Sequence, residues 1–352
     1  MNSRQRAAEA RTSTDVAVLR ERSVDSEASV REAAYVNPAL PPDWKRLLER
    51  AGAFVEPLVE EVGEAWTDWN GAEVSRAPTE VRRASIPPDP TLTAAELEPL
   101  LALGPFARQL VASHPGASSE QFERLVDDTS ADVVRALAKA TRSADLLDRL
   151  ARNPRADYAV ANSPFAGPAT LARLGASTNE YVRAGVAAHR STPPDVLEAL
   201  AADTSSKVLE ALAGNRAAPP TALANIPSLP LVREALVNNP SAPPDVRERV
   251  LLEMARSTDW LTRSAAGSCR LALPASVVAV LRADASARVR ESLATHRALS
   301  AELFEALATD ASPAVRRAVV ENPACPDALH RRLREDPDSN VRAGWRERPG
   351  RT

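Results

Sequence analysis

Apolar positions along the chain recur with the spacing of short amphipathic helices of two alternating types. The first type begins at proline, as at Pro193, and places leucines on one face, as at Leu197 and Leu200. The second type carries a Val-Arg pair and repeats an aliphatic residue four positions later, as at Val182 and Val186. Because isolated helices shorter than about 12 residues are marginal in water, both types must bury their stripes against neighbours.

The two types alternate with a nearly constant period. The Val-Arg phrase has clear copies beginning at Val30, Val182, Val232, Val289, Val315 and Val341, and weaker copies at Arg108, Arg135, Tyr158, Leu209 and Arg263. From Arg108 to Arg342 the spacings are 27, 23, 25, 26, 24, 30, 27, 26 and 26 residues. This regularity predicts an all-α solenoid of about ten to eleven repeats of roughly 26 residues, each with two helices of which the second is the shorter.

The residue that ends the second helix is polar at most copies. Asparagine is the commonest, and its tolerance of the left-handed conformation predicts a helix cap. The position is held by Asn37, Asn215, Asn239 and Asn322, by His114, His189 and His296, and by Cys269. The three histidines lie three and four repeats apart, roughly 30 and 40 Å at about 10 Å per helix layer, so they are too far apart to share a metal. His330 lies outside this position, and we expect it on the solvent face.

The order of a proline-initiated helix, an Asp turn, Val-Arg-x-x-Val-Ala and Asn-Pro resembles the leucine-rich repeat variant family of bacteria. The resemblance covers about residues 12–50 and 97–346, and it implies a right-handed superhelix of alternating α- and 3₁₀-helices without β-strands. The units here are nearer 26 than about 24 residues, which allows an α-helix in the second place. The family's founding member has a cysteine cluster ahead of its repeats, and this chain has no cysteine before Cys269. The resemblance implies no biochemical activity.

The period is interrupted over residues 51–96. Phe54, Leu58, Val62 and Trp66 follow one another at i+4, with Trp69 on the same side, which predicts a helix with one apolar face. A Pro-rich linker follows this stretch. Two interpretations stay open, namely a degenerate repeat or end cap with both tryptophans in the core, or an acidic, aromatic docking element for a partner.

These boundaries predict the organisation of the chain. We expect a flexible N-terminus over 1–11, an N-terminal repeat or cap over 12–50, the acidic interruption over 51–96, a continuous solenoid over 97–346 and a C-terminal tail over 347–352.

Composition limits the function classes. Lys and Arg number 44 against 47 Asp and Glu, a net charge of −3, which argues against a surface that binds nucleic acid everywhere. Cys269 and Cys325 are two repeats apart, roughly 20 Å, whereas a disulfide needs Cα atoms within about 7 Å. With no signal-like or membrane-spanning apolar stretch, we expect a cytoplasmic protein with no membrane contact.

No motif indicates a catalytic, cofactor-binding or metal site. The acids Asp203, Asp284, Asp310 and Asp336 recur six residues before the arginine register, and we expect them to cap a turn and to balance that arginine. Asp259 beside Trp260 is the one pair that suggests a helical-repeat DNA glycosylase, although a tryptophan packed by a local insertion explains it more simply.

The arginines of the Val-Arg phrase recur at one register and predict a ladder along one edge. They are Arg183, Arg233, Arg263, Arg290, Arg316 and Arg342. They would either bond carbonyls and the neighbouring aspartates or form a stripe that binds phosphates or an acidic protein. The positions that follow them are expected to face the surface: Ala184, Glu234, Ser264, Glu291 and Arg317.

The sequence therefore favours a non-enzymatic scaffold that binds a peptide or protein partner on the solenoid surface. Possible contacts are the ladder arginines together with Trp66 and Trp69. Nucleic-acid binding through the arginine ladder is the alternative, and a DNA glycosylase is less favoured. The sequence does not predict the oligomeric state or the identity of the partner.

Overall fold

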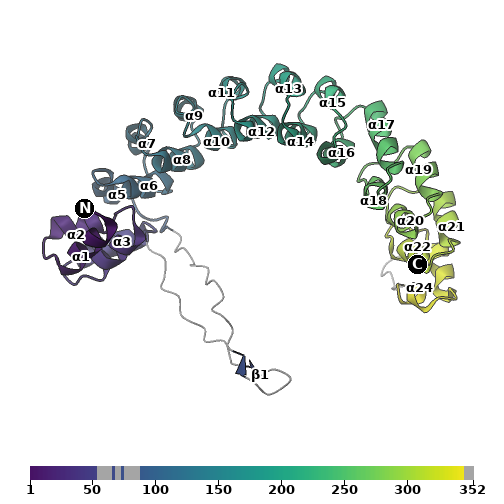
Figure 1. Cartoon of the computed structure of the whole chain (residues 1–352), viewed down its shortest axis with the longest axis horizontal. Helices are drawn as coiled ribbons and strands as arrows, with labels where there is room; N and C mark the ends of the chain where they lie inside the picture. Colours follow the sequence, from purple (N-terminus) through teal and green to yellow (C-terminus); the bar gives the residue numbers. More distant parts are fainter. Residues whose placement is uncertain (54–65, 68–72, 75–87, 345–352) are drawn as a thin grey trace. The chain divides into compact units, whose positions relative to one another are not determined.

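The structure, a computed structural model, describes residues 1–53, 66–67, 73–74 and 88–344. It divides into two compact units, Met1–Gly167 and Pro168–Thr352, each built from pairs of short helices (Figure 1). Within a repeat, the helix of the proline type is called the first helix, and the helix of the Val-Arg type is called the second helix. The prediction of an all-α repeat fold is confirmed, with one pair of two-residue strands as the exception among the described residues.

In the unit Met1–Gly167, second helices pack on second helices, α1 on α3 and α6 on α8. The second helices of this unit are α1 (Ser3–Thr12), α3 (Ala28–Tyr35), α6 (Pro105–Ser113), α8 (Ala131–Ala140) and α10 (Asp157–Ala161). The first helices are α2 (Val16–Arg22), α4 (Pro42–Arg50), α5 (Ala94–Leu101), α7 (Ser119–Leu125) and α9 (Ala144–Leu150).

In the unit Pro168–Thr352, first and second helices form two rows (Figure 1). The second helices are α12 (Glu180–Ala188), α14 (Ser206–Gly214), α16 (Pro230–Val237), α18 (Trp260–Gly267), α20 (Ala287–Ala294), α22 (Pro313–Glu321) and α24 (Ser339–Gly344). The first helices are α11 (Pro168–Leu174), α13 (Pro194–Leu200), α15 (Pro220–Asn225), α17 (Pro244–Ala255), α19 (Ala275–Arg282), α21 (Ala301–Ala308) and α23 (Asp327–Arg332), the last followed by the 3₁₀-helix η1 (Leu333–Glu335).

The predicted apolar stripes form the core. Val182 and Val186 of α12 and Leu197 and Leu200 of α13 are at most 5% exposed, as expected for neighbouring helices that bury each other's stripes. Proline occupies the first turn of α13, where its missing N–H costs no hydrogen bond. The described residues contain no helix with both the length and the apolar character needed to cross a membrane.

The prediction that the second helix is the shorter of the two is wrong for most repeats, although it holds at α9–α10 and at α17–α18. Helices α12 and α14 have 9 residues each, whereas α11 and α13 have 7. The second helices in the described residues are α-helices rather than the 3₁₀-helices that the family resemblance implies. A period of about 26 residues is about two residues longer than the family's unit, or roughly half an α-helical turn, which leaves room for a regular α-helix in the second place.

Two expectations near the N-terminus also change. Residues 1–11 are not a flexible terminus, because α1 begins at an Asn2–Gln5 capping box and buries Ala7 and Ala10 in a core shared with α3. The helix predicted through Trp66 is wrong at that residue, since Trp66–Thr67 (β1) pairs antiparallel with Glu73–Val74 (β2). Trp69 and the rest of that expected helix lie outside the described residues.

The row of second helices in the Pro168–Thr352 unit has one weak joint. Helix α12 packs on α14, α14 on α16, and α18 on α20, but α16 and α18 do not pack closely on each other. At the α18–α20 contact, a Cβ atom on Gly267 would lie 2.4 Å from Ser292 Oγ, so only glycine permits that approach. Between α16 and α18 the chain inserts α17, a first helix of 12 residues.

Candidate functional site

A polar residue at the end of several second helices joins consecutive repeats. Asn215 Nδ2 donates to the carbonyl oxygens of Ala187 and His189 in the preceding repeat, at 2.8 and 3.2 Å. Its Oδ1 accepts the N–H of Ala217, which closes the turn after α14. The same arrangement recurs at Asn37, Asn239 and Asn322. These side chains therefore satisfy carbonyls that the preceding helix end leaves open.

His296 performs the same task with its two ring nitrogens, whereas for His114 and His189 the described bond is that of Nδ1, which accepts the N–H two residues later. His296 Nδ1 accepts the N–H of Ala298, and Nε2 lies 3.1 Å from the carbonyl oxygen of Leu271 in the preceding repeat. The predicted capping role is confirmed, but the predicted left-handed conformation is wrong. Asn322 has φ −70° and ψ 119°, and no described residue other than glycine has a positive φ. With this extended backbone, the Asn322 side chain bonds to carbonyl oxygens of the previous repeat. A left-handed cap would instead satisfy carbonyls of its own helix end.

The structure also places His330 and the two cysteines. His330 is buried at 5% exposure, so its predicted place on the solvent face is wrong. Cys269 and Cys325 are buried and form no disulfide, and burial raises the pKa of the Cys269 thiol. A thiol with a raised pKa is a poor nucleophile at neutral pH.

Four of the six predicted ladder arginines form ion-paired rungs between repeats. Arg183 Nε lies 2.6 Å from Asp203 Oδ2, and its second terminal nitrogen lies 3.0 Å from Oδ1 of the same carboxylate. The same two-pronged pairing joins Arg263 to Asp284, Arg290 to Asp310, and Arg316 to Asp336. Two further rungs that the prediction did not include lie in the other unit: Arg6–Asp25 and Arg108–Asp128.

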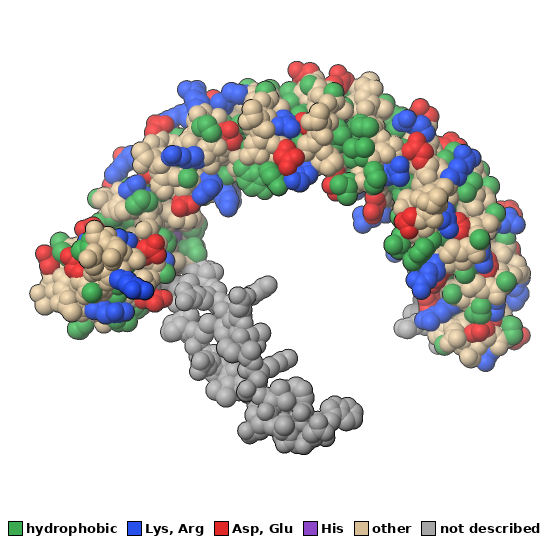
Figure 2. Space-filling model, viewed as in Figure 1, with side chains coloured by type: hydrophobic (Ala, Val, Ile, Leu, Met, Phe, Trp, Pro, Cys, Tyr) green, Lys and Arg blue, Asp and Glu red, His purple; other side chains and the backbone are tan. Residues whose placement is uncertain are grey.

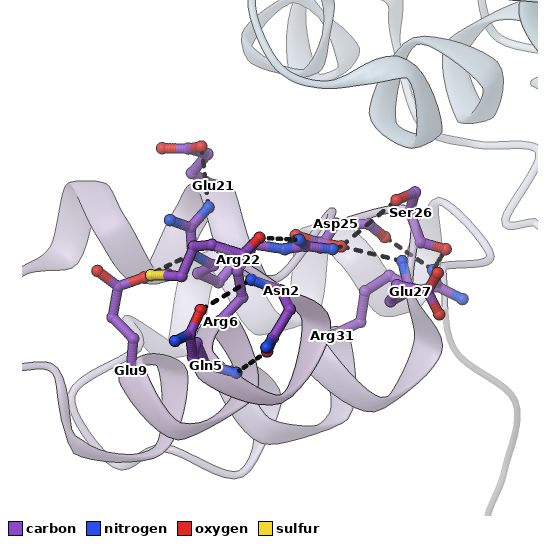
Figure 3. Close-up of polar contacts among 11 residues, drawn as sticks. Asn2, Gln5, Arg6, Glu9, Glu21, Arg22, Asp25, Ser26, Glu27 and Arg31 are labelled. Carbon is purple, nitrogen blue, oxygen red and sulfur yellow. Dashed lines mark hydrogen bonds and ion pairs between the residues drawn. The ribbon is translucent and has the colours of Figure 1, made fainter.

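From Arg263 to Arg342, consecutive ladder arginines are also joined through the backbone. Arg290 Nη1 donates to the carbonyl oxygen of Asp284, 2.6 Å away, while the Asp284 carboxylate binds Arg263 of the preceding repeat. Figure 3 shows this geometry at the first rung, where Arg6 binds the Asp25 carboxylate and Arg31 binds the Asp25 carbonyl. The aspartates were expected to cap a turn and to balance the arginine six residues later. Asp310 does cap its turn through the Ser312 N–H, but its carboxylate pairs with Arg290 of the preceding repeat. The later Arg316 donates to the Asp310 carbonyl oxygen, and the Asp310 charge acts on it only at longer range.

The rungs are largely withdrawn from solvent. The arginine side chains of the six rungs are 13–23% exposed and the aspartates 4–10%. Hydrogen bonds from Arg183 and Arg316 lower the pKa values of Asp203 and Asp336. At Asp310, burial opposes ionisation, but the hydrogen bonds from Arg290 and the Ser312 N–H outweigh it and lower the pKa.

These lowered pKa values predict acid sensitivity. An unfolded aspartate titrates near about 3.9, above the folded rung aspartates, so the unfolded chain binds more protons in that range. The stabilisation is therefore complete above about pH 5 and is lost as the pH falls through the lower folded pKa values. Urea unfolding midpoints of the wild type and Asp310→Asn, measured from pH 7 to pH 3, should converge in acid. Parallel curves would contradict the assignment.

Two ladder arginines lack a carboxylate partner in the described structure. Arg233 Nε donates to the carbonyl and hydroxyl oxygens of Ser228, each 3.2 Å away. Arg342 donates to the carbonyl oxygens of Asp336 and Pro337. The structural interpretation of the ladder is thus confirmed by geometry, since all six predicted arginines bond a carbonyl or an aspartate. Their role as partner contacts stays a prediction.

Large apolar side chains are exposed in the first turn of several second helices. Tyr181, Leu231 and Leu261 each lie two residues before a ladder arginine, and their exposed fractions are 53%, 61% and 60%. Trp260 is 36% exposed, and the guanidinium of Arg288 lies 5.0 Å from its ring centroid. Of the positions expected to face the surface, Glu234 and Arg317 are exposed, and Ala184, Ser264 and Glu291 are half-buried. On the face drawn in Figure 2, acidic and basic side chains are interspersed.

The Asp259–Trp260 pair has a structural explanation. Asp259 is the N-cap of α18, and its carboxylate accepts the N–H groups of Leu261 and Thr262. Hydrogen bonds from the Thr262 hydroxyl and backbone lower the pKa of Asp259. The carboxylate is thus engaged by the helix end.

The comparisons with known proteins agree with the repeat. The model of the leucine-rich repeat variant family matches residues 182–205, the segment from α12 to the turn before α14. No curated protein matches the chain. The resemblance stated from the motifs is confirmed at this unit.

Solved helical-repeat structures are similar over longer stretches. A leucine-rich repeat variant with a novel repetitive motif is 22% identical over 62% of this chain and 86% of its own, with a TM-score of 0.44. A Pds5–Scc1 complex is 13% identical over 97% of this chain and 58% of that one, at 0.24. A designed armadillo repeat protein in complex with the peptide (KR)4 is 13% identical over 71% of this chain and 88% of its own, at 0.15.

Proposed function

We propose that this chain, a helical repeat protein with a leucine-rich repeat variant unit at residues 182–205, is a non-enzymatic scaffold that binds a peptide or protein. The binding surface is the first turn of the second helices in the Pro168–Thr352 unit. The carrying observation is the recurrence of Tyr181, Leu231 and Leu261 at one register with more than half of each side chain exposed. Single exposed apolar residues are ordinary, but three of them at one register, on α12, α16 and α18, offer a partner repeated contacts.

The same helices also carry buried apolar residues next to the exposed ones. Val232, one residue after Leu231, is fully buried, so the chain separates an interior stripe from an exposed one on α16. Repeat proteins use such extended surfaces for binding. Cys269 and Cys325, buried and not joined in a disulfide, fit the cytoplasmic location that we propose with this function.

Affinity capture tests the proposal. The full chain, immobilised and exposed to host extract, should retain at least one protein that a Leu231→Ser/Leu261→Ser variant does not. Both residues are exposed, so the variant should keep the wild-type melting temperature, which circular dichroism checks. Identical capture by wild type and variant would contradict the assigned surface.

Nucleic-acid binding through the ladder predicts a different result. Because Arg290 and Arg316 are engaged by aspartates, we expect no shift of duplex or single-stranded DNA, nor of RNA, even at low salt. A salt titration of the purified chain measures this. Binding that weakens with salt, and that Arg290→Glu/Arg316→Glu/Arg342→Glu abolishes in a folded protein, would instead make the ladder a phosphate-binding stripe.

A further inference from the structure

The ladder is interrupted at two successive places in the Pro168–Thr352 unit, and the two interruptions differ. At the first, Leu209 holds the arginine register and Pro227 holds the place six residues before Arg233, so both charges are absent. At the second interruption, Arg233 is present, but the aspartate that would pair with it is missing. An arginine without its carboxylate is therefore left at α16, half-buried and bonded to Ser228.

Ser257 holds the position of the missing aspartate. Arg263 Nη1 donates to the Ser257 carbonyl oxygen at 2.9 Å, as Arg290 does to that of Asp284. Ser257 Oγ accepts the N–H of the residue two positions later, as Asp284 Oδ1 does. Ser257 thus reproduces the turn of an aspartate without its charge. The only carboxylate that the described contacts join to Arg233 is Glu253, through the Ser228 hydroxyl.

The incomplete rung at Arg233, here called the open rung, lies among exposed apolar side chains. Leu229 is the N-cap of α16 and Leu231 lies in its first turn, and Trp260 and Leu261 are in the first turn of α18. The two helices are joined near their C-terminal ends, where the Arg270 N–H donates to Asn238 Oδ1 at 2.7 Å. Within the described chain, no hydrogen bond or ion pair joins their N-terminal ends. The gap in the ladder and the exposed leucines therefore coincide.

We propose that this open rung binds an acidic, apolar peptide segment of a partner protein. A carboxylate of the segment pairs with Arg233 in place of the absent aspartate, and its apolar side chains cover Leu231 and Leu261. Arg288, stacked on Trp260 and without a carboxylate in the described contacts, offers a second cation beside the same surface. The inference rests on the proposed function and specifies its partner. The four complete rungs of this unit show the geometry that the incoming carboxylate would adopt.

Peptide selection tests this inference. The full chain would be panned against a phage library of random 12-residue peptides, and enriched peptides would be synthesised with a fluorescent label for polarisation titrations. We expect enriched peptides to share an Asp or Glu near Leu or an aromatic residue. Replacing that acid by its amide should weaken binding at least 10-fold, roughly the loss of one charge-assisted hydrogen-bonded pair.

Variants of the chain locate the contact. Arg233→Met and Ser257→Asp, which removes the arginine or fills the rung internally, should each weaken binding at least 10-fold. Arg183→Met is the matched control, because it breaks a complete rung and should lower the melting temperature without changing the peptide's Kd more than twofold. Unchanged Kd in both Arg233→Met and Ser257→Asp would overturn the inference and leave the scaffold function standing. No enrichment of any peptide would count against both.

Discussion

Asp310→Ala is expected to lower the free energy of unfolding by roughly 2–4 kcal/mol, the cost of removing one partner of a mostly buried, hydrogen-bonded ion pair. The substitution leaves Arg290, 17% exposed, without the carboxylate that receives two of its N–H groups. It also removes the acceptor for the Ser312 N–H at the start of α22. Urea unfolding of the full chain, followed by circular dichroism, measures the loss.

Glu321→Ala is the matched control for this prediction. Glu321 pairs with Arg317 four residues earlier on α22, but the two side chains are 47% and 50% exposed. Exposed pairs of this kind contribute less than about 0.5 kcal/mol. If Asp310→Ala and Glu321→Ala lower the free energy of unfolding by the same small amount, the rungs do not stabilise the contact between repeats.

Asn322→Ala should produce a loss of similar size, roughly 2–4 kcal/mol, since it leaves buried carbonyls without donors. Asn322 Nδ2 donates to the carbonyl oxygens of Ala294 and His296, at 2.8 and 2.9 Å, and the residue is 3% exposed. The chain supplies its own rescue variant. Because His296 fills the same position, Asn322→His should unfold at a urea concentration between those of the wild type and Asn322→Ala.

Asn162→Ala is the control for this prediction, because it removes an asparagine side chain that makes no described bond to another repeat. Its Nδ2 donates to the carbonyl oxygen of Tyr158 within its own helix end, and the side chain is exposed. Water can replace that bond, so the change in unfolding free energy should stay below about 0.5 kcal/mol. A loss at Asn162 equal to that at Asn322 would contradict the inter-repeat role.

The helices and their buried faces could be predicted because they depend on local periodicity. Val182 and Val186 share a face whichever neighbour covers them, and proline marks a helix start by its own chemistry. The Val-Arg phrase also predicted that the arginines stand at one register. Arg6 and Asp25 were missed because no valine precedes Arg6, although an arginine and an aspartate 19 residues apart could have indicated a rung.

The direction of the polar contacts could not be predicted from the sequence. An aspartate six residues before one arginine and 20 after another fits either partner by spacing, and packing of the repeats decides which carboxylate oxygen meets which guanidinium. The cap asparagines posed the same difficulty, because a left-handed backbone satisfies carbonyls within one helix end. Here Asn215 satisfies those of the previous repeat, a choice that depends on tertiary contact.

The weak joint between α16 and α18 has a consequence for how the Pro168–Thr352 unit loses its structure. In a linear array, cooperativity is carried by the interfaces between neighbours. At this joint α16 and α18 are coupled mainly through α17, which packs on both, and the carboxylate of the rung is missing. We therefore expect residues 168–237 and 259–344 to unfold more independently of each other than other neighbouring repeats do, and a ligand bound across the open rung would couple them more tightly.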